Sequence, residues 1–95
     1  MIRVLVVDDQ DLVREGFAVM LSLCDDIEVV GQASDGSEAL AVAIHERPDV
    51  VLMDLRMPGT DGIEATRHIV AEELADVIVL TSFDEDELVL GAIRA

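Results

Sequence analysis

Short apolar runs without alternation divide the chain, and each is typical of a strand that is covered on both faces of a parallel sheet. These runs cover residues 4–7, 50–53 and 77–80 and consist of Val, Ile, Leu and Met. A fourth stretch, residues 27–33, is interrupted by polar side chains. Its pattern predicts a strand at the edge of the same sheet.

Between these runs, apolar residues recur at helical spacing, which predicts amphipathic crossover helices. The predicted apolar faces comprise Val13, Phe17, Met20 or Leu21 and Cys24; then Leu40, Ala43 and Ile44; then Ile63, Thr66, Ile69 and Val70; and finally Leu88, Val89, Ala92 and Ile93. This pattern places Cys24 in the core. His45 and His68 lie beside polar neighbours and lack metal-type spacing, so we interpret them as surface residues.

Helix starts are marked by a repeated pair, an aspartate followed three residues later by a glutamate, as in a capping box. The pairs are Asp35 and Glu38, Asp61 and Glu64, and Asp84 and Glu87. Arg47 followed by Pro48 predicts the end of the second helix. The resulting order β-α-β-α-β-α-β-α predicts an α/β fold with an open parallel sheet and helices on both faces.

Composition limits the function of this chain of 95 residues, which is enough for one small domain. Six basic and 21 acidic residues give a net charge of −15, which argues against direct contact with nucleic acid or an anionic membrane. A single cysteine excludes an internal disulfide. We find neither a signal peptide nor a membrane-spanning run, so we expect a cytoplasmic protein.

Acidic residues follow two of the predicted strands, at the sheet edge where open α/β folds bind ligands. Asp8 and Asp9 follow the first run, Asp54 follows the third strand, and Thr81 follows the fourth. Two like charges about 4 Å apart repel by about 4 kcal/mol at an effective dielectric of 20. A hard divalent cation would relieve this repulsion, and Mg²⁺ with oxygen ligands suits a shallow site.

Most of the acidic residues need no such explanation. Many belong to a solvated surface or to helix caps, and Asp8 or Asp9 alone could cap the first helix. Asp54 is harder to explain in this way, because it stands at the mouth of a buried strand. Beside Mg²⁺, its carboxylate could attack a phosphorus centre and form an acyl phosphate, while Thr81 donates a hydrogen bond to the transferred oxygens.

Four motifs in this order resemble the receiver domain of two-component response regulators, over the whole chain. They occupy residues 6–9, 52–59, 61–62 and 79–82. Residues 12–17 and 82–86 resemble the NarL/FixJ (LuxR-type) branch of that family. The resemblance implies a flavodoxin-like, CheY-like sheet with strand order 2-1-3-4-5.

The resemblance also implies a role for each matching residue. Asp54 would be the phosphoacceptor, taking a phosphoryl group from a sensor histidine kinase. Asp8, Asp9, Asp54 and the backbone carbonyl of Arg56 would hold Mg²⁺, and Thr81 would be the switch hydroxyl. A separate DNA-binding domain would normally convert the switch into control of transcription.

The sequence departs from the family pattern at its end. Residues 1–95 are expected to form an incomplete receiver domain, order 2-1-3-4, without the fifth strand and fifth helix. The chain contains no lysine, so the family lysine that pairs with the phosphoryl group is missing. We therefore expect poor phosphorylation. Because residues 77–80 would form an exposed apolar edge strand, we also expect poor stability, or self-association or a homodimer through exposed surfaces.

Two other functions remain open at this point. A pseudo-receiver that only binds partners is compatible with the missing lysine. A metal-dependent phosphatase or a nucleotide-binding enzyme would normally carry a glycine-rich phosphate loop, a Walker-type motif or an Asp-x-Asp after the strand, and the chain has none of these. We expect no enzyme activity beyond the chain's own phosphorylation and dephosphorylation.

Overall fold

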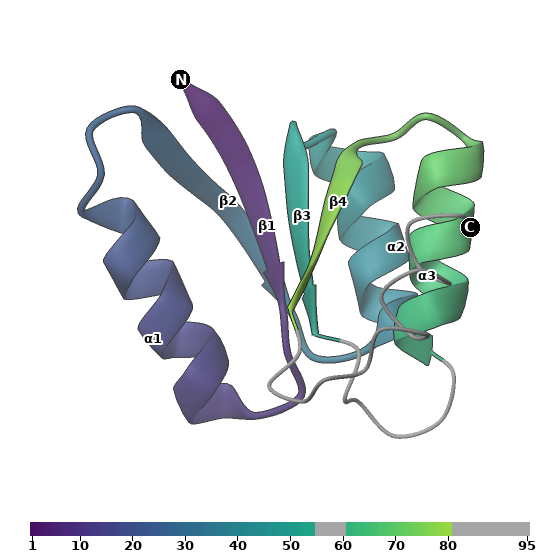
Figure 1. The fold of residues 1–95 in the computed structure, drawn as a ribbon, viewed down its shortest axis with the longest axis horizontal. Coiled ribbons are helices and arrows are strands. Elements are labelled where there is room, and N and C mark those ends of the chain that lie inside the picture. Colours follow the sequence, from purple (N-terminus) through teal and green to yellow (C-terminus); the bar gives the residue numbers. More distant parts are fainter. Residues whose placement is uncertain (55–60, 81–95) are drawn as a thin grey trace.

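Strands and helices alternate through the part of the chain that a computed structural model describes, residues 1–54 and 61–80 (Figure 1). The elements are β1 (Ile2–Val7), α1 (Asp11–Ser22), β2 (Ile27–Ala33), α2 (Gly36–Glu46), β3 (Val50–Asp54), α3 (Asp61–Ala71) and β4 (Asp76–Leu80). The predicted strands and the first three helices are thereby confirmed. The predicted fourth helix, with its Asp84 and Glu87 pair, lies outside the described residues.

The four strands form a parallel sheet in the order β2-β1-β3-β4, as predicted. Val4 lies beside Val29 on one side and Val50 on the other, and Val51 pairs with Val77. The register of β1 against β2 shifts between Val4 and Leu5. In this part of the sheet β2 is an edge strand, which matches its polar interruptions.

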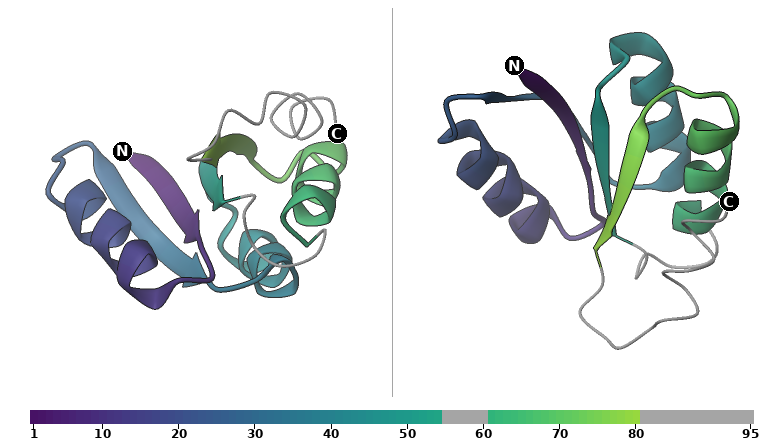
Figure 2. Two further views of the ribbon diagram at one scale, coloured as in Figure 1. Left: turned by 60° about the horizontal axis from the view of Figure 1, so that its bottom comes forward. Right: turned by 45° about the horizontal axis from the view of Figure 1, so that its top comes forward.

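Helices cover both faces of the sheet, with α1 on one face and α2 and α3 on the other (Figures 1 and 2). Alternation along β1 explains this arrangement, because consecutive side chains of a strand point to opposite faces. Leu5 and Val7 join the core beneath α2 and α3, whereas Val4 and Val6 are buried on the face of α1.

The main core lies between the sheet and the pair α2 and α3. Its buried members are Leu5, Val7, Ala33, Ala39, Ala43, Val51, Met53, Ala65 and Ile69. Small alanines on α2 let this helix approach the sheet closely. At Gly31 a Cβ atom would lie 2.9 Å from Cγ1 of Val42, so this position has no room for a side chain unless Val42 moves.

The ends of α2 follow the sequence signals. The Asp35 carboxylate accepts a hydrogen bond from the Glu38 backbone N–H at 2.7 Å, which confirms the predicted N-cap. The helix ends at Glu46, and Arg47 takes a left-handed conformation with φ 51° before Pro48. Proline disfavours a helical conformation in the residue before it, so the helix stops here.

The prediction that Cys24 belongs to the core is wrong. Helix α1 ends at Ser22 and Leu23 is its C-cap, so Cys24 lies in the following turn with its side chain exposed. Met20 is 58% exposed, whereas Leu21 is partly buried, so Leu21 is the residue that continues the apolar face. Helical spacing alone could not show that the helix ends before Cys24.

The exposure of side chains on α2 and α3 confirms some of the predicted surface and core positions and contradicts others. His45 and His68 are exposed, as predicted. Ile44 on α2 and Val70 on α3 were assigned to apolar faces, but they are 51% and 37% exposed. Among the described residues, no helix has the length and apolar character needed to cross a membrane.

Candidate functional site

The carboxyl ends of β1 and β3 bring three aspartates together at one edge of the sheet, the lower edge in Figure 1. Val7 pairs with Met53, so the residues that follow them, Asp8 and Asp54, emerge side by side. One carboxylate oxygen from each of Asp8, Asp9 and Asp54 lies within 4.8 Å of the others. The predicted convergence of these three side chains is therefore present.

The three carboxylates differ in exposure. Asp8 and Asp54 are each only 3% exposed, whereas Asp9 is exposed. The cluster therefore combines two buried carboxylates with one that solvent reaches. A small cation with several water ligands suits such a site.

Hydrogen bonds hold Asp8 through its backbone and its side chain. Its backbone N–H donates to the Ala33 carbonyl at 3.1 Å, which continues the pairing of β1 with β2. Its carbonyl accepts a hydrogen bond from Nη1 of Arg14 at 2.9 Å. Its carboxylate Oδ1 accepts the Gln10 backbone N–H at 2.9 Å.

The electrostatics at Asp8 oppose its ionisation. Burial raises the pKa of Asp8, and the hydrogen bond from the Gln10 backbone N–H acts in the opposite direction. The neighbouring charges of Asp54 and Asp9 raise this pKa further. Ionising Asp8 therefore costs free energy, and a bound cation would remove that cost.

The donor set fits Mg²⁺. All three side chains offer carboxylate oxygens, and hard divalent cations prefer oxygen ligands. Neither a histidine nor a cysteine takes part in the cluster, which disfavours a softer transition metal. The predicted carbonyl ligand of Arg56 and the predicted hydroxyl of Thr81 lie outside the described residues.

Arg14 contacts Asp8, a residue of the acidic cluster, and the sequence did not predict this contact. It lies within the segment that resembles the NarL/FixJ branch, but its contact with the Asp8 carbonyl was not predicted. The usable signal was its position six residues after Asp8, close enough for its long side chain to reach back to the end of β1.

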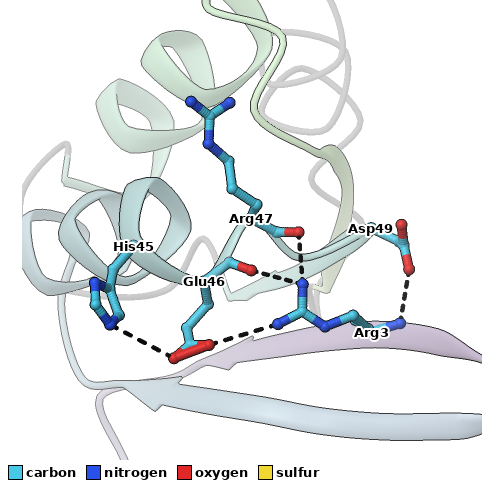
Figure 3. Close-up of polar contacts among 5 residues, drawn as sticks. All are labelled: Arg3, His45, Glu46, Arg47 and Asp49. Carbon is cyan, nitrogen blue, oxygen red and sulfur yellow. Dashed lines mark hydrogen bonds and ion pairs between the residues drawn. The ribbon is translucent and has the colours of Figure 1, made fainter.

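The opposite edge of the sheet contains a different polar cluster (Figure 3). Nη1 of Arg3 donates to the carbonyls of Glu46 and Arg47 at 2.7 and 3.1 Å, and the Arg3 backbone N–H donates to Asp49 Oδ2 at 2.9 Å. His45 lies 3.9 Å from the Glu46 carboxylate. Arg3 therefore ties the start of β1 to the end of α2.

A depression of about 730 Å³ also lies at this opposite edge, beside the starts of β3 and β4. Pro48, Asp49, Leu74 and Asp76 are among the residues that line it, and none of the three clustered aspartates does. Cavity size therefore does not point to the acidic cluster. The cluster is distinguished by its converging charges.

Comparison with known proteins agrees with this geometry. The family model for the response regulator receiver domain matches residues 4–95. The chain belongs to this family. It is thus a signalling domain of the two-component type, as the motifs predicted, and the phosphoacceptor reaction of such domains fits an aspartate in the acidic cluster.

Three relatives place the receiver domain more closely. The chain is 55% identical to the transcriptional regulatory protein LiaR of Bacillus subtilis, over 100% of this chain and 46% of LiaR. It is 48% identical to protein-glutamate methylesterase/protein-glutamine glutaminase 3 of Anaeromyxobacter dehalogenans, over 96% of this chain and 27% of that protein. The receiver domain of the putative response regulator NarL from Mycobacterium tuberculosis superimposes with a TM-score of 0.89 at 39% identity, over 98% of this chain and 76% of that chain.

The likeness to LiaR and NarL confirms the predicted branch of the family. The receiver chain nevertheless spans less than half the length of two curated relatives, 46% of LiaR and 27% of the methylesterase/glutaminase. One of them is named as a transcriptional regulator and the other as an enzyme. The receiver domain therefore does not by itself specify the output of the protein that carries it.

Proposed function

We propose that this receiver domain accepts a phosphoryl group on Asp54 from a phosphohistidine of a sensor histidine kinase and thereby switches its contacts with partners. The observation that carries the proposal is the convergence of Asp8, Asp9 and Asp54 within 4.8 Å at the carboxyl edge of the sheet. Placing acids side by side makes their charged forms less stable, so such a cluster is not expected unless it binds a cation.

In the proposed reaction, an Asp54 carboxylate oxygen attacks phosphorus and forms the acyl phosphate bond. The bond between phosphorus and the histidine nitrogen breaks, and the imidazole keeps the electron pair and becomes neutral on taking up a proton. Bound Mg²⁺ supplies positive charge that stabilises the transferred oxygens. Asp8, Asp9 and Asp54 would hold the ion.

Two further residues are assigned roles by family resemblance. We assign the backbone carbonyl of Arg56 as an additional Mg²⁺ ligand. We assign the Thr81 hydroxyl as a donor to the phosphoryl oxygens and as the start of the conformational switch. The domain catalyses at most its own phosphorylation and dephosphorylation, and membership of the family supports a cytoplasmic place of action.

The proposed partners are the sensor kinase and a second copy of the receiver domain. Exposed apolar side chains support self-association, among them Ile78 at 52% and Leu23 at 79%. In light scattering, Ile78→Thr should shift the chain toward monomer, because β4 is an edge strand in the described sheet. An unchanged particle size would argue against an interface at β4.

For the whole protein we propose control of transcription through a separate DNA-binding domain. The support is the higher identity to LiaR than to the methylesterase, 55% against 48%. The receiver domain itself carries a net charge of −15, which disfavours direct contact with nucleic acid.

Intact mass after incubation with Mg²⁺ and a small acyl-phosphate donor tests the acceptor role. We expect one phosphoryl adduct on the wild-type chain, formed slowly because no lysine is present, and none on Asp54→Asn. Asp76→Asn is the matched control, since this exposed aspartate starts β4 at the opposite edge, and it should behave as wild type.

Each contrary result has a clear meaning. An adduct that persists in Asp54→Asn would place the acceptor elsewhere. No adduct on the wild-type chain at saturating donor would contradict the acceptor role and favour the pseudo-receiver, a module that binds partners without phosphorylation. Retention of partner binding by Asp54→Asn under phosphorylating conditions would favour the same alternative.

A further inference from the structure

Arg14 uses all three nitrogens of its guanidinium group near the acidic cluster. Nη1 donates to the Asp8 carbonyl at 2.9 Å, Nε to the Gln32 side chain at 3.2 Å, and Nη2 to the Asp11 carboxylate at 2.7 Å. The Arg14 side chain is only 14% exposed. A planar group with three separate acceptors is held in one orientation.

These contacts join three elements around one short turn. Asp8 follows the end of β1, Gln32 belongs to β2, and Asp11 begins α1 with Arg14 one turn further along the helix. The turn between β1 and α1 contains only Asp8, Asp9 and Gln10, so it includes two of the three acids of the cluster. Arg14 therefore spans the segment that presents those acids.

The contact with Asp8 is made through its backbone, not its carboxylate. The Ala33 carbonyl already accepts the Asp8 N–H, so both peptide groups of this residue are fixed from outside the turn. The charge of Arg14 is balanced by Asp11 at 2.7 Å. Arg14 can thus orient Asp8 without neutralising the cluster that is to bind a cation.

We propose that Arg14 is a positioning residue for the cation site, holding the Asp8 peptide so that the Asp8 and Asp9 carboxylates point toward Asp54. This inference rests on the proposed Mg²⁺ site. Groups that orient metal ligands without touching the metal commonly change metal affinity by 10–100-fold when they are removed.

A purely structural role for Arg14 makes a different prediction. The exposed side of its network, the ion pair with Asp11 at 80% exposure, is of a type that contributes little to stability. If Arg14 served only to hold α1 on the sheet, its removal would lower the stability of the fold and leave the affinity of the folded protein for Mg²⁺ unchanged.

Titration calorimetry of the 95-residue chain with MgCl₂ separates these roles, at a temperature where circular dichroism shows every variant folded. We expect Arg14→Met to weaken Mg²⁺ binding about tenfold. Arg14→Lys should fall between wild type and Arg14→Met, because an ammonium group keeps a donor for the Asp8 carbonyl but loses the planar fork that also reaches Gln32.

Arg3→Met is the matched control. Arg3 also donates from a guanidinium group to backbone carbonyls, but at the opposite edge of the sheet, so its removal should leave Mg²⁺ affinity unchanged. Gln32→Met provides a second test that keeps Arg14 itself. It removes one acceptor of the guanidinium group and should weaken Mg²⁺ binding by less than Arg14→Met does.

Equal weakening in Arg14→Met and Arg3→Met would overturn the inference, because it would report general loosening of the fold. Unchanged affinity in Arg14→Met would also overturn it, while leaving the proposed Mg²⁺ site intact. Failure of the wild-type chain to bind Mg²⁺ is a separate result that would overturn the proposed site and this inference with it. If Arg14→Met does not fold, Arg14→Lys and Gln32→Met decide by the same comparison with Arg3→Met.

Discussion

Carboxylates at the carboxyl edge of the sheet, where the strands end, have different neighbours from those at the amino edge, where the strands begin. At the amino edge, Asp49 and Glu46 lie against Arg3, which donates hydrogen bonds to the Asp49 carboxylate and to carbonyls at the end of α2. At the carboxyl edge, Asp8 lies against two other acids, and the nearby Arg14 contacts its carbonyl instead of its carboxylate.

This difference distinguishes acids that lie beside an arginine from the acids that we propose bind a cation. The acids at the amino edge lie beside Arg3, which gives Asp49 a backbone N–H donor and Glu46 a positive charge. An acid buried among other acids has its charged form destabilised, as the raised pKa of Asp8 indicates. Structural arginines occur at both edges, so the presence of an arginine does not distinguish them. The distinction lies in which atoms the arginine contacts.

The largest expected effect is the loss of the response to Mg²⁺ in Asp8→Asn. At a Mg²⁺ concentration of about 100 times Kd, binding should stabilise the wild-type chain by about 2.7 kcal/mol. Asp8→Asn retains an oxygen for the Gln10 N–H but removes one buried charge, so the Mg²⁺-free variant should be more stable than wild type. Urea unfolding followed by circular dichroism, with and without MgCl₂, measures both quantities.

Asp49→Asn is the control at the amino edge, because an amide oxygen can still accept the Arg3 backbone N–H. Its response to Mg²⁺ should equal that of wild type. A response to Mg²⁺ that survives in Asp8→Asn would remove the proposed functional difference between the two edges.

The pH dependence of the unfolding free energy of wild type and Asp8→Asn tests the comparison further. The pKa of Asp8 is raised in the folded state, so the folded state binds more protons than the unfolded state above the usual aspartate pKa of about 3.9. The stability linked to Asp8 is therefore present at low pH and is lost as the pH rises through the folded-state pKa. Without Mg²⁺, wild type should lose stability relative to Asp8→Asn over that range. A difference that does not change with pH would contradict the electrostatic explanation.

A smaller effect is expected at the amino edge from Arg3→Met. This change removes a charged donor from two carbonyls at the end of α2, although partial exposure allows water to replace it. We expect a loss of about 1.5 kcal/mol in the free energy of unfolding, measured in urea. Arg67→Met, at an exposed arginine of α3, should cause no comparable loss. Equal losses in both variants would show that Arg3 does not clamp the fold.

The smallest effect is expected at the other end of α2. Asp35 caps the start of this helix near the carboxyl edge, and its carboxylate is exposed and hydrogen-bonded to the Glu38 N–H. Asp35→Ala should cost about 0.5–1 kcal/mol in unfolding free energy, and Asp35→Ser should retain most of it. Equal destabilisation by both substitutions would mean that the cap hydrogen bond does not stabilise the helix.

Local pattern predicted the elements well and the contacts poorly. The apolar runs located β1, β3 and β4 because buried strands require consecutive apolar residues. Helical spacing placed Cys24 in the core, yet α1 ends before it. The link between Arg3 and Glu46 joins positions 43 residues apart, and no local pattern contains information about such a pairing.

The candidate site was predicted in part. The topology of a parallel sheet brings residues that follow adjacent strands to one edge, so the meeting of Asp8, Asp9 and Asp54 could be expected from the sequence. The unequal burial of Asp8 and Asp9 could not, because it depends on how the turn after β1 is folded. The same turn determines that Arg14 reaches the Asp8 carbonyl.

The sequence by itself determined the order of strands and helices, the position of the acids after the strands, and the family. These properties depend on side-chain periodicity and on motifs that are contiguous along the chain. Only the tertiary structure decided the register of β1 against its neighbours, the burial of Asp8 and Asp54, and the atoms that Arg3 and Arg14 contact. Those properties arise from long side chains and backbone groups that meet only after distant segments have packed together.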